Sequence, residues 1–534
     1  MKLSTAPTRS SGRKIVGDFP TPPGLVAEIL AAPGLIGGRY PRVLEPTCGR
    51  GHFVAGLLAL AEPPREIRGF ELQPGHAEAA RALAGRVPGV RLVVETADLF
   101  AVDLARDVAW AGSGPLLVVG NLPWVTVAGL GASGADGGPA RVNARGARGI
   151  DAMTGASNFD ISEALWLKLV RELAPQRPTI ALLCKTAVAR AVLRAVATDD
   201  LPIVAAEIRR VDALRWFRAA VDACLLRVEV GPGPKATEAP VYRDLAATEP
   251  ESRLGLGAGG LIADVEAYAR SSFADGACPI AWRQGVKHDA AAVMELTVDA
   301  GGSLRNKRGE VVDVEPDFVF PLLKGTDLAG GSRPRPRLAV LVTHRRLGED
   351  TRPLERRAPK LWAYLTAHSA RFEARKSSIY RGRPPFSLFG IGDYAFAPYK
   401  VAISGLHKTP RFRAIGPVAG RPTLLDDTSY FLPCRTPEQA AILAATLNGD
   451  EALDLVRALV FPDAKRPITK AVLRRIDPRP LLARADAAGL QARAEAEWKA
   501  LTGGRPGSAP ASGPLAWQDD WAADFPDRPT HPSR

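Results

Sequence analysis

The sequence predicts an α/β protein: a doubly wound parallel sheet followed by an α+β domain. Short apolar runs alternate with amphipathic helical stretches through residues 42–123, and the pattern resumes after a Gly/Ala-rich insertion at 128–157. Such runs are typical of strands buried on both faces of a parallel sheet. The segment 231–240, GPGPKATEAP, is rich in helix and strand breakers and predicts a linker. The length of 534 residues also favours more than one domain.

The elements of the first domain, residues 1–232, follow from this alternation. The runs RVLEP, EIRGFEL, VRLVVETADLF and PLLVVGN predict four strands, with helices at FVAGLLALA and HAEAARALAG between them. After the insertion, helices are expected at ISEALWLKLVREL and AVARAVLRAVA, and strands at TIALLCK, IVAAEIRRV and AVDACLLRVEV. Together these segments predict a sheet of about seven strands.

The second half of the chain has a less regular pattern. Residues 233–480 contain strand-like fragments such as VVDVEPDFVF, RLAVLVTH and KVAISGL, separated by Gly/Pro-rich loops, which predicts an α+β domain. Residues 481–534 predict a C-terminal helix and then, from about 503, a mobile tail whose composition is GGRPGSAPASGP followed by Trp and Asp.

Charge and cysteine content narrow the classes of partner and compartment. Lys and Arg number 70 against 57 Asp and Glu, giving a net charge of +13 that favours a polyanionic partner, with nucleic acid the first candidate. The five cysteines form no CxxC pair, so neither a metal site nor a disulfide framework is predicted. The first residues lack the apolar core of a signal peptide, and no apolar run approaches the ~18 residues of a membrane span. A cytoplasmic protein without a membrane partner is expected.

Three acidic residues at successive strand ends predict a ligand site. Glu45 ends the first strand and precedes a glycine-rich turn, Glu71 ends the second 20 residues after Gly51, and Asp98 follows the third. Open α/β sheets bind ligands at the carboxyl ends of their strands, and this spacing suits a carboxylate that meets ribose hydroxyls. The turn has neither GxGxxG spacing nor a P-loop lysine, which favours a nucleoside ligand without phosphates.

The fourth strand ends in Asn121, Leu122, Pro123 and Trp124, which are the candidate catalytic residues. The Asn121 side chain offers one carbonyl acceptor, and a following backbone carbonyl, held by the rigid X-Pro segment, offers a second. Two acceptors aimed at one NH2 group can bind both hydrogens and make its lone pair available for attack on an electrophile. Trp124 offers an aromatic face on which a planar base can stack.

These motifs resemble those of S-adenosylmethionine-dependent methyltransferases of the class I, Rossmann-like fold. EPTCGRGHF is similar to their motif I, DFPTPPGLVAEIL to the segment before it, and NLPW to the (N/D/S)-P-P-(Y/F/W) motif of amino methyltransferases. The resemblance implies S-adenosylmethionine as cofactor. It implies that the cofactor is held by Phe19, Thr21, Pro22, Glu45, Pro46, Cys48, Gly49, Gly51, Glu71, Asp98 and Phe100.

Two further segments resemble motifs near the target base. RWFRAAVDACLLRV (215–228) is similar to motif VIII, which implies that Phe217, or alternatively Trp216, stacks on the base face opposite Trp124. SNFDISEALW (157–166) is similar to the motif V region, which places Phe159 and Asp160 near the cofactor or the base. The preceding loop, with Arg141, Arg145 and Arg148, could close over substrate or be a solvated loop.

The order of the motifs matches the gamma class of DNA adenine N6-methyltransferases, in which the carboxy-terminal region recognises the target. Residues 375–408, LLDDTSYFL (424–432) and FPDAKRPITKAVLRRID (461–477) are similar to TaqI-like specificity domains. The resemblance implies duplex DNA as partner and base flipping as the means of access. Arginine suits guanine, and lysine and serine suit phosphates. The predicted DNA contacts are Arg375, Lys376, Ser377, Arg381, Arg383, Tyr399 and Lys400.

The function expected from these observations is site-specific methylation of adenine N6 by the modification component of a restriction-modification or related defence system. Leu122 replaces the first proline of the motif and occurs in the NLPY motif of ribosomal RNA adenine dimethyltransferases, so an RNA adenine methyltransferase is the alternative. A protein glutamine methyltransferase and a non-catalytic DNA-binding protein with a relict fold are further alternatives. No nuclease motif is evident, so a cognate endonuclease is expected on a separate chain.

Overall fold

The computed structural model describes residues 20–35, 39–124, 160–257, 260–299, 301–330, 334–461 and 466–503. The chain divides into two compact units, the first ending at Val265 and the second beginning at Glu266. Phe19, Phe159 and the predicted arginine loop lie outside the described residues, as does the predicted tail beyond 503.

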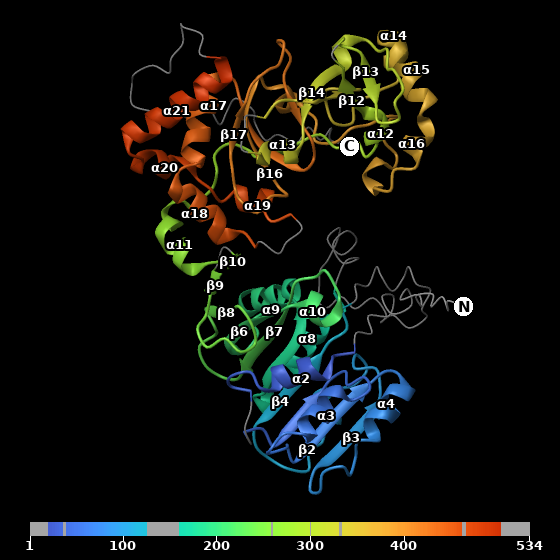
Figure 1. Ribbon diagram of the computed structural model, residues 1–534, viewed down its shortest axis with the longest axis vertical. Coiled ribbons are helices and arrows are strands. Elements are labelled where there is room, and N and C mark those ends of the chain that lie inside the picture. The colour runs from blue at the N-terminus through green and yellow to red at the C-terminus, as the bar shows by residue number, and fades with distance from the viewer. Residues whose placement is uncertain are drawn as a thin grey trace, which may run out of the picture. The chain divides into compact units, whose positions relative to one another are not determined.

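A ten-stranded sheet forms the centre of the first unit (Figure 1). Its order is β10-β9-β8-β6-β7-β5-β4-β1-β2-β3. The strands are β1 Arg42–Glu45, β2 Glu66–Glu71, β3 Arg91–Thr96, β4 Leu116–Asn121, β5 Thr179–Lys185, β6 Ile203–Val211, β7 Ala223–Val230, β8 Glu238–Tyr242, β9 Ser252–Gly257 and β10 Gly260–Ile262. From β3 to β5 all neighbours are parallel, whereas β7 is antiparallel to both β5 and β6. All seven strands predicted for this domain are present.

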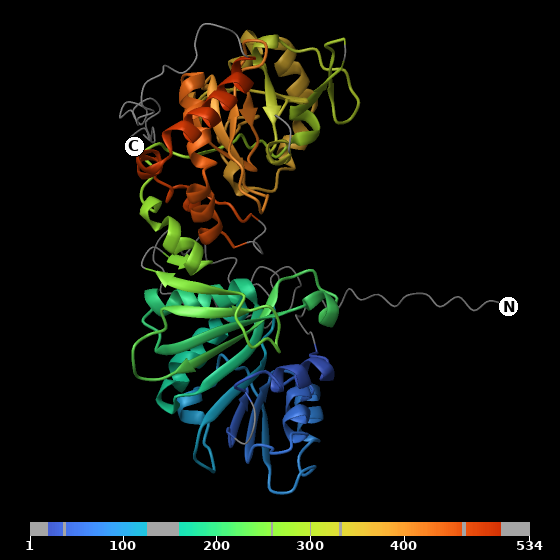
Figure 2. The same cartoon turned by 60° about the vertical axis from the view of Figure 1, so that its left-hand side comes forward.

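Helices cover both faces of this sheet, as a doubly wound fold requires (Figure 2). One face carries α2 Pro23–Leu30, α3 His52–Leu58 and α4 Pro74–Arg81, and the other carries α8 Ile161–Leu173 and α9 Thr186–Thr198. Two short helices, α5 Leu104–Asp107 and α10 Ala213–Phe217, complete the described set. Because both faces are covered, β2, β4 and β5 are buried along nearly their whole length. This burial is why β4 and β5 are nearly continuous apolar runs rather than alternating ones. In β2 the buried Glu66 and Arg68 form an ion pair at 3.1 Å.

The first unit extends beyond the boundary at 232 that the sequence predicted. β8 pairs in parallel with β6, and β9 and β10 continue the sheet. The buried guanidinium of Arg209 donates to the carbonyl oxygens of Leu245 (3.1 Å) and Ala247 (2.7 Å), which holds this extension against β6. The breaker-rich segment 231–240 is therefore a turn that leads into β8 within one unit, not a linker between domains.

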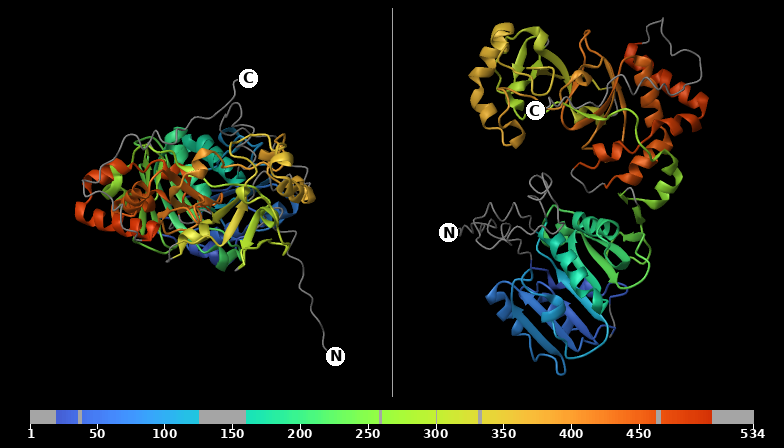
Figure 3. Two further views of the ribbon diagram at one scale, coloured as in Figure 1. Left: turned by 90° about the horizontal axis from the view of Figure 1, so that it is seen from above. Right: turned by 180° about the vertical axis from the view of Figure 1, so that it is seen from behind.

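The second unit contains two sheets, and its α+β character agrees with the prediction (Figure 3). Their orders are β11-β19-β16-β17 and β13-β12-β15-β14-β18. The strands are β11 Arg283–Gln284, β12 Glu295–Val298, β13 Leu304–Asn306, β14 Val319–Leu323, β15 Leu338–Leu341, β16 Tyr399–Ser404, β17 Arg413–Ile415, β18 Leu424–Leu425 and β19 Ser429–Cys434. The predicted strand VVDVEPDFVF is only partly strand, because β14 begins at Val319 and a 3-10 turn precedes it.

Each sheet of the second unit has its own helices and core. α17 Pro437–Leu447 and α18 Asp450–Leu459 pack with α20 Pro478–Arg484 and α21 Ala487–Thr502 in the core that includes β16 and β19. The other core joins β12, β14 and β15 to α12, α14, α15 and α16, whose bounds are Ala291–Met294, Leu354–Arg357, Pro359–Ala367 and Ser369–Glu373. Three further short helices are α11 Val265–Ser271, α13 Gly325–Ala329 and α19 Lys470–Leu473. Within the described part of the chain, no helix is long and apolar enough to cross a bilayer.

Candidate functional site

Four predicted site residues lie at the carboxyl ends of neighbouring strands in the first unit. Glu45, Glu71 and Asn121 are the last residues of β1, β2 and β4, and Asp98 follows β3 by two residues. Because β3, β2, β1 and β4 are adjacent and parallel, these side chains lie along one edge of the sheet. Glu45 and Asn121 are far apart in sequence, and the parallel pairing of β1 with β4 brings them to the same edge.

Glu45 is a buried carboxyl group, 2% exposed. Its Oε2 accepts no hydrogen bond from the described part of the protein. Burial raises the pKa of Glu45 well above its usual range, and nearby Glu71 raises it further, although the Val54 N–H partly opposes this. Gly120 makes the position possible, since a Cβ there would lie 3.3 Å from Cγ of Glu45.

The glycine-rich turn after β1 is held against Glu71. The backbone N–H of Gly49 donates to Oε2 of Glu71 at 2.8 Å, and that of Gln73 donates to Oε1 at 2.9 Å. Gly49 (φ +52°) faces open space, whereas a Cβ on Gly51 (φ +84°) would lie 3.1 Å from the backbone of Ala80. Gly51 is thus required by packing, and Gly49 leaves room for a ligand beside a fixed carboxylate.

Cys48 is a buried residue of the same turn and contributes through packing. Its Sγ would lie 3.1 Å from a Cβ on Gly69, so the thiol fills the space above β2. Burial, followed by the charges of Glu45 and Glu71, raises the pKa of the Cys48 thiol. The thiol therefore stays protonated and is not a nucleophile. Pro46, also buried, continues the chain from Glu45 into the turn.

The other predicted cofactor residues flank this edge. The carbonyl of Thr21 lies 2.8 Å from Nδ1 of His52, which joins the segment before α2 to α3, and Pro22 caps α2. Asp98 is exposed, and its Oδ1 accepts the N–H of the half-buried Phe100 at 3.0 Å.

Sequence reasoning did not single out Leu72. It follows Glu71 and is 63% exposed, so it presents an apolar surface next to the carboxylate. A leucine that follows a strand directly is expected in the core from sequence. The structure shows Leu72 exposed because β2 ends one residue earlier, at Glu71. Its position makes it a candidate contact for a planar ligand.

The segment Asn121–Trp124 leaves β4 at the same edge. The hydroxyl of Thr47 donates to the backbone carbonyl of Asn121 at 3.0 Å, and the hydroxyl of Ser162 donates to the carbonyl of Pro123 at 2.6 Å. Neither hydroxyl was predicted, because both bonds join residues at least 39 positions apart in sequence. The carbonyl of Leu122 lies between these two fixed carbonyls.

The aromatic residues separate into two groups. Trp124 and Phe217 meet edge to face, with ring centroids 5.1 Å apart and an interplanar angle of 66°. Trp216, by contrast, lies beside Gly24 of α2, and its ring stacks with the guanidinium of Arg215 at 4.4 Å. Of the two predicted alternatives, Phe217 is the one that the fold brings to Trp124.

Asp160 lies at the start of α8 and has structural partners. Its Oδ1 caps the helix by accepting the Ser162 N–H at 3.1 Å, and its Oδ2 forms an ion pair with Lys185 at 2.7 Å. Lys185 ends β5, the neighbour of β4. The ion pair therefore joins the beginning of α8 to the strand beside the Asn121 segment.

The predicted DNA contacts in the second unit differ in their accessibility. Lys376, Arg381 and Arg383 are exposed on the loop after α16. Arg375 instead donates to the carbonyls of Phe372 (3.0 Å), Ser387 (2.9 Å) and His288 (3.4 Å), and stacks on Tyr380 at 3.7 Å. Arg375 thus anchors this loop, while its three exposed neighbours present positive charge to solvent. Ser377 and Tyr399 are half-buried.

Lys400 is not placed to contact DNA, which corrects the prediction. It is the second residue of β16, an internal strand of its sheet, is 1% exposed, and its Nζ donates to the carbonyl of Ala397 at 2.6 Å. Burial lowers the pKa of Lys400 from 10.5 to about 7. The sequence YKV presents a lysine beside an aromatic residue, and the sequence does not show that β16 is buried from Lys400 to its end at Ser404.

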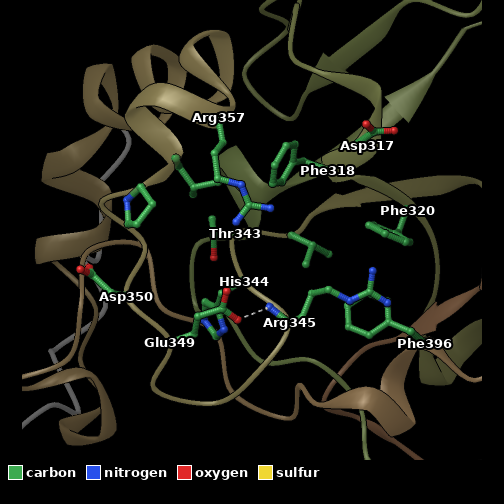
Figure 4. Close-up of a pocket in the computed structure, with 13 residues that line it drawn as sticks. Asp317, Phe318, Phe320, Thr343, His344, Arg345, Glu349, Asp350, Arg357 and Phe396 are labelled. Carbon is green, nitrogen blue, oxygen red and sulfur yellow. Dashed lines mark hydrogen bonds between the residues drawn. The ribbon is translucent and has the colours of Figure 1, made fainter.

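The second unit also contains a cavity of about 190 Å³ that the sequence did not indicate (Figure 4). Phe318, Phe320 and Phe396 supply aromatic walls, and the Arg345 guanidinium stacks on Phe396 at 4.1 Å. Arg357, the last residue of α14, also lines the cavity (Figure 4). Aromatic faces and guanidinium groups together suit planar or anionic ligands.

The chain has a relative of known class over most of its length. No protein-family model matches the chain. The chain is 35% identical over 462 residues to type II methyltransferase M.NspV from a Nostoc strain, a match that covers 86% of this chain and 96% of that protein. Among solved structures, the type IIL restriction-modification enzyme MmeI in complex with DNA aligns with a TM-score of 0.54 at 12% identity, over 88% of this chain and 66% of that one. At that identity the second match concerns the fold alone.

Replacing Lys400 by methionine should stabilise the second unit. The pKa of Lys400 is lower in the folded protein than in the unfolded chain, so between about pH 7 and 10.5 the unfolded state binds more protons. The loss of stability caused by burying Lys400 is therefore fully present below pH 7 and decreases as the pH rises. We expect Lys400→Met to raise the melting temperature at pH 6.5 by roughly 4–8 °C, equivalent to about 2 kcal/mol, and this gain to shrink toward pH 10. Thermal melts followed by circular dichroism at pH 6.5 and pH 10 measure the gain in melting temperature and its decrease with pH. The exposed control Lys376→Met should change neither, and a gain independent of pH would contradict the account.

Proposed function

Because the chain belongs to the type II methyltransferase family, we propose that it methylates DNA at the exocyclic N6 amine of an adenine turned out of the duplex. The methyl donor would be S-adenosylmethionine. The proposed role is modification within a restriction-modification system. The observation that carries the proposal is the placement of Asn121 and Leu122, at the end of β4, beside the ligand edge formed by Glu45, Gly49 and Glu71.

The residues present fit S-adenosylmethionine. Glu45 offers a buried carboxyl whose Oε2 has no partner among the described residues, which suits a ligand ammonium group. Glu71 is fixed by two backbone N–H groups and keeps lone pairs for ribose hydroxyls, and Gly49 faces open space. Asp98 and Leu72 are exposed at the adjoining strand ends and suit an adenine ring. When bound, this cofactor supplies an electrophilic methyl group on its sulfonium.

The Asn121 segment would prepare the amine for attack. The lone pair of an adenine NH2 is delocalised into the ring, and hydrogen bonds from both N–H groups to the Asn121 side chain and the Leu122 carbonyl favour a pyramidal nitrogen. Such a nitrogen is nucleophilic without prior loss of a proton, so a strong general base is unnecessary. The bond from nitrogen to the methyl carbon forms as the carbon–sulfur bond breaks, and the surplus proton on nitrogen leaves afterwards.

Aromatic contacts would hold the extruded base. Trp124 and Phe217 already meet edge to face, and a base entering between them would replace that contact with two stacking contacts. Stacking is worth ~1–3 kcal/mol per base, comparable with the few kcal/mol that extrusion costs. The exposed Lys376, Arg381 and Arg383 of the second unit would hold the DNA backbone.

One observation favours a second candidate. Leu122 occupies the position that carries proline in most DNA-specific motifs, and it is compatible with an RNA adenine methyltransferase. The family membership supports DNA instead, so RNA methylation is treated as an outcome of the test below.

Replacing Asn121 by alanine tests the proposed chemistry. The protein is incubated with labelled S-adenosylmethionine and either unmethylated genomic DNA or total RNA, and the products are digested to nucleosides. We expect label in N6-methyldeoxyadenosine, and a rate for Asn121→Ala reduced roughly 100–1000-fold, as for loss of one transition-state hydrogen bond. Cofactor affinity, measured by calorimetry, serves as the control and should not change. Label in N4-methylcytosine, or only in RNA, would refute the assigned substrate.

Binding of S-adenosylmethionine should release a proton from Glu45. Its pKa is raised in the free protein, and a ligand cation would favour the charged carboxylate, so affinity should rise with pH until Glu45 ionises unaided. Calorimetry in buffers of different ionisation enthalpy measures the released protons directly. Glu45→Gln should bind more weakly and release none. Equal proton release by the variant would show that another group titrates.

The exposed cations after α16 should set the salt dependence of DNA binding. A phosphate contact contributes about −0.9 to the slope of log K against log salt. The triple variant Lys376→Gln/Arg381→Gln/Arg383→Gln should therefore flatten the slope by up to ~2.7. Arg352→Gln is the matched control, because that guanidinium is already paired with Asp350 at 3.0 Å. An unchanged slope in the triple variant would place the DNA elsewhere.

A further inference from the structure

Two hydroxyl groups hold the backbone on either side of the Leu122 carbonyl. Thr47, in the turn after β1, donates to the carbonyl of Asn121 at 3.0 Å. Ser162, the second residue of α8, donates to the carbonyl of Pro123 at 2.6 Å. The two donors belong to different elements that lie more than a hundred residues apart in sequence. They bind the first and the third of three consecutive carbonyls.

Ser162 is itself rigidly placed. Its side chain is fully buried, at 0% exposure, and its N–H is capped by Asp160, which is in turn paired with Lys185 at the end of β5. Thr47 is anchored as well, because the same turn carries Glu45 two residues earlier and is bound to Glu71 through Gly49. Neither hydroxyl has the freedom of a surface side chain. Each bond therefore fixes one backbone carbonyl relative to the turn after β1 or to the start of α8.

These bonds restrict the one peptide group between them. Peptide units are planar, so fixing the carbonyls of Asn121 and Pro123 fixes the planes before and after the Leu122–Pro123 unit. The pyrrolidine ring also fixes φ of Pro123 near −65°. Little rotation then remains for the plane that carries the Leu122 carbonyl, and that oxygen keeps one direction.

We propose that Thr47 and Ser162 are positioning residues for methyl transfer, which aim the Leu122 carbonyl at the substrate amine without touching the substrate. This inference rests on the proposed function. Thr47 has a second consequence, because it bonds the turn that holds the methyl donor to the segment that holds the acceptor. The relative position of donor and amine is then set by one hydrogen bond between two short loops.

The experiment compares four variants of the full-length chain. Thr47→Val and Ser162→Ala remove each hydroxyl with little change of volume, and Thr47→Ser keeps it. Ser271→Ala is the matched control, since Ser271 is equally buried and donates to the carbonyl of Ala267 at 2.9 Å in the second unit. Single-turnover methyl transfer to unmethylated genomic DNA is measured alongside KM for DNA, affinity for S-adenosylmethionine and the melting temperature.

The expected result is a slower chemical step with intact binding. Thr47→Val and Ser162→Ala should each lose roughly tenfold to 100-fold in single-turnover rate, the scale of a small misplacement at a reacting centre. Thr47→Ser and Ser271→Ala should match the wild type, and affinity for S-adenosylmethionine should be unchanged in all four.

Three outcomes would overturn the proposal: wild-type rates in Thr47→Val and Ser162→Ala, a rate in Thr47→Ser as low as in Thr47→Val, or a loss of cofactor affinity that accounts for the loss of rate. Failure of the proposed function itself is distinguishable. In that case the wild-type protein would transfer no methyl group to DNA adenine. The positioning role is tested only with an active wild type, by comparing the rates of the variants with it.

Discussion

The adjacency of β1 and β4 is the constraint on which the candidate site depends. Parallel pairing in register brings Glu45 and Asn121 to the same edge, although 75 residues separate them in sequence. Gly120 permits the close approach, because any side chain there would press on Glu45. The Thr47 hydroxyl then bonds one loop to the other. The turn after Glu45 and the Asn121 segment are therefore neighbours because of the sheet, and a hydrogen bond joins them.

The first unit could be predicted from sequence to a large extent, for a physical reason. Strands buried on both faces of a sheet are typically rich in apolar residues, and when they are parallel their carboxyl ends lie at the same edge of the sheet. Glu45, Glu71 and Asn121 were therefore identifiable before their contacts were known. The roles assigned to them remain proposals. The boundary at 232 was misplaced because the breakers in 231–240 mark a turn within a sheet as readily as a linker.

The second unit was harder to predict, because charge in a sequence does not reveal burial. Lys400 and Arg375 were both predicted as DNA contacts within residues 375–408, yet Lys400 lies within a sheet core and Arg375 donates to backbone carbonyls. Lys376, Arg381 and Arg383 differ from them only in exposure. Long-range hydroxyl bonds such as those of Thr47 and Ser162 carry no sequence pattern at all. Threonine and serine are common in turns and at helix starts, and their partners are set by tertiary structure.

A structure of the protein with duplex DNA containing its target site and an unreactive analogue of the methyl donor would test the central claim most directly. The account predicts an adenine outside the duplex, with its N6 about 3 Å from both the Asn121 side-chain oxygen and the Leu122 carbonyl oxygen, a normal hydrogen-bond length. An adenine still stacked in the duplex, or an N6 held by other groups while those two oxygens point elsewhere, would contradict it.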